Sequence, residues 1–256
     1  MIKTGFKSLD NLVDFSKSGV TILSGFGFAD ILSGDIANNI CLQQECDVLE
    51  VVNCKKEYLV KRLLVNNANV NYKKWTLKDQ YTKEELQEIG QAKVDLIEVT
   101  KRLPTIIEQE LDLYNLRNIA KLVDKWANCY ADREDISTAV ILDIFPLNRE
   151  VKSKNEKRYT RESVKLIKKL YRISKRLNCP IIIVAGVELK KQYNSFKCIS
   201  PKDIDIGKVN RFIDNYILLN HTNENKIFSL DVYNKEGKVR TCKLKYDYDI
   251  RKFEEI

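Results

Sequence analysis

The stretch Val20–Ser24 (VTILS) is a short apolar run that ends at a glycine, and a second apolar pattern begins seven residues further on. Such a run, rich in β-branched side chains and bounded by glycine, predicts a buried strand. In Ile31–Gln44, the side chains Leu32, Ile36 and Ile40 recur every four residues, which predicts a helix with one inward face. A buried strand, a glycine-containing turn and a helix together indicate an α/β fold.

The same two patterns alternate along much of the remaining chain. Further buried strands are predicted at Val48–Val52, Thr138–Ile144 and Ile181–Ala185, and helices at Tyr58–Ala68, Lys83–Val99, Leu111–Tyr130 and Thr160–Asn178. Continuous apolar strands that alternate with helices indicate a mostly parallel central sheet with helices on both faces. The last part of the chain alternates apolar and polar residues. It is expected to extend the sheet with antiparallel strands at Tyr216–Leu219, Lys226–Tyr233 and Val239–Tyr246.

Composition limits the kind of protein that this chain can be. Its 256 residues contain no repeat and no linker-like segment, so we expect a single domain over residues 1–256. No apolar run approaches the roughly 20 residues that cross a bilayer. No secretion signal opens the chain either, so we expect a cytoplasmic protein without membrane contact. The seven cysteines form no C-x-x-C pair and the single histidine is His221, so no metal site is predicted.

The chain is basic, with 44 lysine and arginine residues against 36 aspartate and glutamate residues and a formal net charge of +8. A basic surface suits contact with a phosphate backbone, because each cation at a phosphate releases counterions. Lysine, asparagine and isoleucine are frequent throughout, however, so a general compositional bias would produce the same excess. Charge alone therefore leaves both nucleic-acid binding and ordinary solvation open.

Several short motifs occur in a fixed order along nearly the whole chain. Thr4–Asp10 reads T-G-F-x-x-L-D before the first strand, Leu142-Asp143 ends a later strand, Pro180 opens the strand at 181–185, and Lys243-Leu244 and Phe253-Glu254 stand near the end. In this order they resemble the C-terminal domain of the DnaB family of replicative DNA helicases. The resemblance implies a RecA-like fold, and it places a phosphate loop between the strand at 20–24 and the helix that follows.

The aligned segment, Ser24–Asp30 (SGFGFAD), departs from the phosphate loop of that family. The motif G-x-x-x-x-G-K-[ST] uses glycine to let backbone N–H groups close on phosphate, lysine to neutralise it and a hydroxyl to hold Mg²⁺. Here Phe28, Ala29 and Asp30 stand at those three positions. Asp30 would place a negative charge where phosphate binds, although it also suits the N-cap of a helix that begins at Ile31. We expect the two phenylalanines of this segment to fill the vacated site.

The other positions that the resemblance assigns to ATP hydrolysis are also altered. The catalytic glutamate of the family aligns with Asn53, an amide that cannot act as a general base, and its glutamine aligns with Gly186. The lysine and arginine that would reach a neighbouring subunit's phosphates align near Tyr233 and Lys235. Only the aspartate on the metal side remains, as Asp143, and a lone aspartate binds Mg²⁺ weakly or simply caps a turn. We expect no cofactor, and ATP and Mg²⁺ would bind only if the site works in a divergent form.

Two basic segments, Asn148–Arg161 and Lys190–Lys208, lie where the loops of DnaB-type motors face single-stranded DNA. The candidate DNA-binding residues are Arg149, Lys152, Lys154, Lys157, Arg158 and Arg161 in the first segment and Lys190, Lys191, Tyr193 and Lys197 in the second. Cations interleaved with aromatic side chains suit sequence-independent binding of a backbone. They equally suit solvated loops in a lysine-rich protein. The further cations of the helix at 160–178 fall opposite its apolar stripe, which is typical of an ordinary solvated helix face.

Three functions are compatible with these patterns. The first is a DnaB-type domain that has lost ATP hydrolysis and acts in DNA replication by binding single-stranded DNA, a replicative helicase or further copies of itself in a ring. Since the motor domain starts directly at the first residues, we expect a stand-alone module without the family's helical N-terminal domain. The second is an active ATP-dependent helicase or translocase with a divergent phosphate loop, and the third is a RecA-fold scaffold with no nucleic-acid role. Losing the lysine, the hydroxyl, the glutamate and the glutamine together argues against the second.

Overall fold

The computed structural model describes most of the chain. The described residues are 2–15, 18–25, 28–44, 46–52, 54–77, 81–98, 104–108, 115–130, 138–143, 154–186, 209–222, 224–237 and 239–256.

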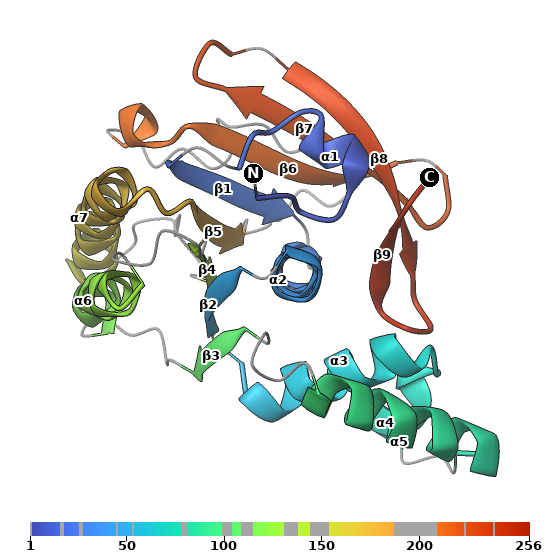
Figure 1. Ribbon diagram of the computed structural model, residues 1–256. Helices are drawn as coiled ribbons and strands as arrows, with labels where there is room; N and C mark the ends of the chain where they lie inside the picture. The colour runs from blue at the N-terminus through green and yellow to red at the C-terminus, as the bar shows by residue number, and fades with distance from the viewer. Residues whose placement is uncertain are drawn as a thin grey trace.

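Within these ranges nine strands form one sheet, in the order β3-β2-β4-β5-β1-β6-β7-β8-β9 (Figure 1). The strands are β1 (Val20–Gly25), β2 (Asp47–Val52), β3 (Thr105–Glu108), β4 (Thr138–Asp143), β5 (Ile181–Gly186), β6 (Asn215–His221), β7 (Ile227–Asn234), β8 (Val239–Asp247) and β9 (Lys252–Glu255). From β3 to β6 in this order neighbouring strands are parallel, and β7, β8 and β9 are added antiparallel. The predicted mostly parallel sheet with an antiparallel C-terminal extension is confirmed.

The described helices are α1 (Lys7–Asp10), α2 (Ala29–Gln44), α3 (Lys56–Ala68), α4 (Tyr72–Leu77), α5 (Lys83–Glu98), α6 (Asn115–Asn128) and α7 (Lys154–Leu177), with a short 3₁₀ turn, η3 (Asn210–Phe212). Helices cover both faces of the sheet, whereas α3, α4 and α5 lie together to one side of it (Figure 1). α6 and α7 lie together on one face, where Val123, Ile167 and Leu170 share a core with alternate side chains of the parallel strands. No described helix is both long and apolar enough to cross a membrane.

α2 covers the other face and is buried on most of its circumference. Leu32 and Ile36 share a core with side chains of the parallel strands and also with Phe228, Tyr246 and Phe253 from the antiparallel strands. Figure 1 shows α2 between the parallel strands and β9. A helix enclosed in this way also buries polar side chains, and these require hydrogen-bond partners inside the protein.

The structure adds α1, α4 and β9, which the sequence patterns do not predict, and it departs from the expectations at α7, α2 and β3. α7 begins at Lys154 instead of Thr160, because residues 154–161 (KNEKRYTR) contain neither glycine nor proline and include several strong helix formers. α2 begins two residues before Ile31, at Ala29. The sequence pattern does not predict β3, because its four residues (TIIE) lie at the sheet edge and make too short an apolar run.

Candidate functional site

The segment aligned with the phosphate loop lies at the carboxyl edge of the parallel strands. β1 ends at Gly25, which is in register with Gly186 at the end of β5 and with Leu219 in β6. β4, which ends at Asp143, is the next strand beyond β5. This edge of an open parallel sheet is where α/β proteins place their ligand sites. The backbone thus brings Gly186 and Asp143 to the same edge as the start of α2, whereas Phe26 and Asn53 lie outside the described residues.

α2 starts with a residue whose side chain cannot bind phosphate. The amide of Leu32 donates a hydrogen bond of 3.0 Å to the carbonyl oxygen of Phe28, so Phe28 occupies the N-cap position. Asp30 is therefore not the N-cap, because the first helical hydrogen bond is made two residues earlier. It lies in the first turn, where it is exposed and its carboxylate interacts favourably with the positive helix end. In a working phosphate loop the same helix end would attract phosphate.

The ring of Phe28 packs against aromatic side chains of β6, β7 and β8. Its centroid lies 5.0 Å from that of Phe228, 4.9 Å from that of Tyr246 and 5.6 Å from that of His221. Burial within this group lowers the pKa of His221. Phe28 is half-buried as a result, and it joins the start of α2 to β6, β7 and β8. That the phenylalanines fill the vacated phosphate position stays a prediction.

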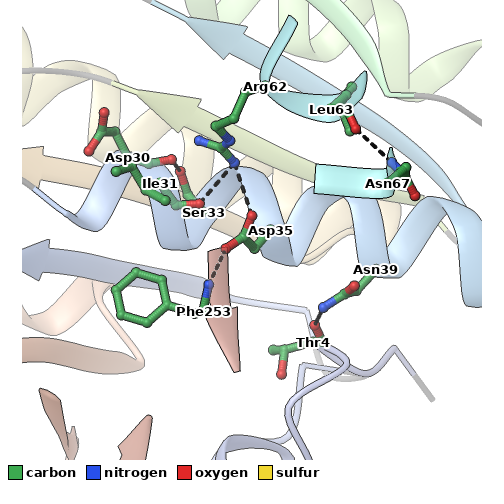
Figure 2. Close-up of polar contacts among 10 residues, drawn as sticks. All are labelled: Thr4, Asp30, Ile31, Ser33, Asp35, Asn39, Arg62, Leu63, Asn67 and Phe253. Carbon is green, nitrogen blue, oxygen red and sulfur yellow. Dashed lines mark hydrogen bonds and ion pairs between the residues drawn. The ribbon is translucent and has the colours of Figure 1, made fainter. Parts of the chain in front are cut away.

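A buried ion pair joins α2 to α3 and to β9 (Figure 2). Arg62 of α3 donates from Nη2 to the carbonyl oxygen of Ile31 at 3.0 Å and to Oδ1 of Asp35 at 3.2 Å. The other carboxylate oxygen of Asp35 accepts a hydrogen bond from the amide of Phe253 at 3.0 Å. The Arg62 and Asp35 side chains are only 3% and 4% exposed. Gly34 makes room for the guanidinium, since a Cβ at that position would collide with it.

Burial dominates the electrostatics of Asp35. Removal from water raises the pKa of this carboxyl from 3.8 to about 6, while the charge of Arg62 and the amide of Phe253 act in the opposite direction. The sequence carries no sign of this pair. Its two members stand on different helices, and each has the residue type of an ordinary surface charge.

The T-G-F-x-x-L-D motif holds the N-terminal segment against α2. Oδ1 of Asp10 accepts hydrogen bonds from the amide of Thr4 at 2.7 Å and from its hydroxyl at 2.8 Å. The carbonyl oxygen of Thr4 in turn accepts from Nδ2 of Asn39 in α2 at 3.0 Å (Figure 2). Gly5 has a φ of 82° and lies so close to Asn39 that a Cβ would collide with it. The motif is therefore explained by packing, and each of its polar groups named here has a structural partner.

Replacing Asp10 with alanine is expected to lower the free energy of unfolding by about 2 kcal/mol, because the amide and the hydroxyl of buried Thr4 would lose their acceptor. Urea denaturation followed by circular dichroism measures the change. Glu88→Ala, which removes an exposed carboxylate from α5, serves as the control and is expected to change stability by less than about 0.5 kcal/mol. Equal effects of the two substitutions would show that the motif does not hold this segment.

Lys235 and Tyr233 lie at the end of the sheet where the parallel strands begin, opposite to the carboxyl ends of these strands and to the start of α2. Tyr233 is in register with Tyr216 near the beginning of β6, at the same edge as the start of β1. Nζ of Lys235 lies 2.6 Å from Oδ1 of Asp214, whose other oxygen accepts a hydrogen bond of 3.0 Å from the amide of Val20. Lys235 therefore neutralises a carboxylate that caps the start of β1, and neither residue can contact a ligand at α2 of the same chain.

The candidate DNA-binding residues are only partly described. Lys154, Lys157 and Arg158 lie on the first two turns of α7, so their predicted location in a loop is wrong, and Arg161 lies in the helix as predicted. The remaining candidates, Arg149, Lys152, Lys190, Lys191, Tyr193 and Lys197, lie outside the described residues. Among the described residues no group of three or more histidine, cysteine, aspartate or glutamate side chains could hold a metal ion.

Comparisons with known proteins agree with this architecture. The profile of the family described as "DnaB-like helicase C terminal domain" matches residues 1–255. No curated protein matches the sequence. Among solved structures, one described as an "ATPase Domain" is similar with a TM-score of 0.80 and 15% identity, over 100% of this chain and 91% of that one. These values refer to the fold alone, since the identity is low.

Two further structures are similar. "The Structure Of A DnaB-Like Replicative Helicase And Its Interactions With Primase" has a TM-score of 0.80 and 14% identity, over 100% of this chain and 62% of that one. This chain thus spans less than two thirds of that helicase chain. The "Crystal structure of the RadB recombinase" has a TM-score of 0.58 and 13% identity, over 100% of both chains. The fold is therefore RecA-like, and because the family profile matches residues 1–255, the chain belongs to the DnaB-like helicase C-terminal domain family.

Proposed function

We propose that this domain acts in DNA replication by binding and does not hydrolyse ATP. It binds single-stranded DNA, a replicative helicase, or further copies of itself in a ring. The observation that carries the proposal is the start of α2. There Phe28, Ala29 and Asp30 supply a half-buried ring, a buried methyl group and an exposed carboxylate. Phosphoryl transfer depends on positioning and on neutralising the phosphate charge, and these side chains do neither.

Mg-ATP does not fit the neighbouring residues either. The hydroxyl of Ser24, at the end of β1, donates to the carbonyl oxygen of Ala185 at 2.6 Å and is committed to the sheet. β5 ends in Gly186, which has no side chain, and the carboxylate of Asp30 would repel a phosphate at the helix end. Asp143 remains as the one carboxylate that the family uses on the metal side. By itself it binds Mg²⁺ weakly, since Mg²⁺ sites of this kind also require phosphate oxygens.

Titration with Mg-ATP tests the loss of the nucleotide site. We expect no saturable heat in calorimetry and no rise in melting temperature up to millimolar nucleotide, with or without single-stranded DNA. A DnaB-type helicase with an intact phosphate loop is the positive control in the same buffers. A micromolar dissociation constant, or ATP turnover stimulated by DNA, would contradict the proposal.

Fluorescence anisotropy with a labelled single strand of DNA tests the binding half of the proposal. We expect binding at low salt that weakens steadily as salt is added, because the contacts are with phosphate. Sedimentation velocity on the same material establishes which oligomer binds. If no binding occurs at low salt, a role in holding DNA is removed and only the protein partners remain.

A further inference from the structure

α7 carries a continuous row of cations along its whole length. The sequence from 154 to 176 contains ten lysine and arginine residues, which are Lys154, Lys157, Arg158, Arg161, Lys165, Lys168, Lys169, Arg172, Lys175 and Arg176. At 3.6 residues per turn these positions fall within a sector of about 120°. The opposite side of the helix holds Ile167 and Leu170, which are buried against the sheet. From Arg161 onward the row therefore follows the outward side of the helix.

Among the described residues, no carboxylate neutralises two of the cations in the middle of this row, Lys169 and Arg172. Glu162 is buried and pairs with Lys165 at 2.9 Å, and Asp124 of α6 pairs with Arg176. Lys169 and Arg172 are exposed, and neither forms an ion pair with any described carboxylate. Two positive charges at the centre of the helix are thus available for an external anion.

α6 completes a groove beside these two residues. The α6–α7 groove has a volume of about 300 Å³, a floor that includes Ala120 and Ile173, and a rim that includes Lys121, Lys169, Arg172 and Arg176. Lys121 is exposed and forms no ion pair with a described carboxylate either. It stands on the α6 side, so cations border the groove from both helices. From Lys169 to Arg176 the rim extends about 10 Å along the helix axis.

We propose that the α6–α7 groove binds the phosphate backbone of a single DNA strand, with Lys121, Lys169 and Arg172 contacting successive phosphates. The proposal rests on the DNA-binding half of the proposed function and moves its contact surface from the basic segments to the outer side of α7. The groove residues of α7 lie C-terminal to Arg161, so they are separate from the segment Asn148–Arg161.

The chemistry of the groove favours a polyanion over a protein helix. Ala120 and Ile173 are 4% and 8% exposed, so the floor offers little apolar surface for the apolar face of a partner helix. The ammonium group of Lys121 on the α6 side and the ammonium and guanidinium groups of Lys169 and Arg172 on the α7 side match phosphate oxygens well. The groove residues are cationic and aliphatic apart from Asp124, and contacts of that kind position a backbone without reading its bases. Binding is expected to be independent of sequence.

Neutralising the two central cations is the decisive experiment. The full chain with Lys169→Gln and Arg172→Gln is compared with a matched variant, Lys83→Gln and Lys93→Gln, which loses two exposed lysines of α5. α5 lies at the far end of the molecule from α6 and α7 (Figure 1). The two variants have the same net charge as each other, because each loses two positive charges. None of the four substitutions is in the core. Melting curves confirm that both are folded before anisotropy is measured with the labelled single strand.

The groove variant is expected to bind at least tenfold more weakly than the α5 variant. The slope of log K against log salt is expected to fall in magnitude by about 1.4, since each lost phosphate contact on a single strand contributes about 0.7. Equal affinity and equal slope for the two variants would overturn the proposal. Duplex DNA that competes as well as single-stranded DNA at equal phosphate concentration would overturn the assignment to a single strand.

A third variant separates this proposal from the proposed function. In this variant four cations of the basic segments are neutralised, namely Arg149, Lys152, Lys190 and Lys191. If it no longer binds DNA while the unmodified chain and the groove variant bind normally, the domain is a DNA-binding protein but the groove proposal fails. If the unmodified chain does not bind DNA at low salt, the groove proposal fails together with the DNA-binding half of the proposed function, and only the protein partners remain. A groove variant whose sedimentation coefficient changes while its affinity per protomer stays constant would identify the groove as a protein interface, which also overturns the proposal.

Discussion

Replacing Arg62 with alanine is expected to lower the free energy of unfolding by about 3–5 kcal/mol at neutral pH. The guanidinium is 3% exposed and is the cationic partner of the buried Asp35, so its removal leaves a carboxylate without a counter-charge in the protein interior. The carbonyl oxygen of Ile31 would lose a donor at the same time. Urea denaturation at neutral pH measures the loss, with Lys93→Ala as the control for removal of an exposed cation.

The pair can also be removed as a whole. In the double variant Arg62→Met with Asp35→Asn, methionine replaces the aliphatic stem, and asparagine still offers an oxygen to the amide of Phe253. More than half of the stability lost in Arg62→Ala is expected to return, because no unpaired charge remains buried. A loss below about 1 kcal/mol in the single variant, or no recovery in the double variant, would show that the pair is not buried in solution.

The pH dependence of stability is expected to carry the signature of Asp35. Its pKa is 3.8 when solvated and about 6 in the folded protein. Between these values the folded chain holds one proton more than the unfolded chain, so this carboxyl makes stability fall as pH rises through the window. Relative to Asp35→Asn, the unmodified protein is expected to lose about 2 kcal/mol between about pH 4.5 and about pH 7.5, since one pKa unit corresponds to about 1.4 kcal/mol.

Denaturation curves for the two proteins, at steps of about one pH unit across that window, provide the measurement. The difference in unfolding free energy removes the contributions of all other titrating groups that the two proteins share. It is expected to change mainly below about pH 6.5 and to be flat above, because the folded carboxyl is then ionised. A difference that grows with pH in favour of the unmodified protein would mean that Arg62 outweighs the burial of Asp35.

The sheet and most of the helices can be predicted from the sequence because their signals are local. Ile181–Ala185 is apolar throughout and Val20–Ser24 is mainly apolar, which is typical of strands covered on both faces. The start of α7 is harder, because residues 154–161 are charged and carry no apolar stripe that would mark a helix. β3 is formed by pairing with β2 rather than by its own short sequence.

Parts of the candidate site can likewise be predicted from the sequence, and other parts cannot. The residue types of Phe28, Ala29 and Asp30 are visible in the sequence, and so is their difference from the motif G-x-x-x-x-G-K-[ST]. Where the ring of Phe28 lies depends on strands that are about 200 residues away in the chain. The pairing of Arg62 with Asp35 likewise depends on how α3 crosses α2, which no local pattern encodes. Contacts of this kind appear only when the fold is assembled.

Segments from both ends of the chain meet on α2, and this has a consequence for how the protein is made. Asn39 holds Thr4, Asp35 holds Phe253, and the amide of Ser8 donates to Oε1 of Glu255, 247 residues away. Closing such long loops is entropically unfavourable, and folds that depend on distant contacts form slowly. Until β9 has left the ribosome, the Asp35 carboxylate lacks its backbone donor. Because β9 is synthesised after the other strands of the sheet, the packing of α2 is completed only when β9 joins the sheet.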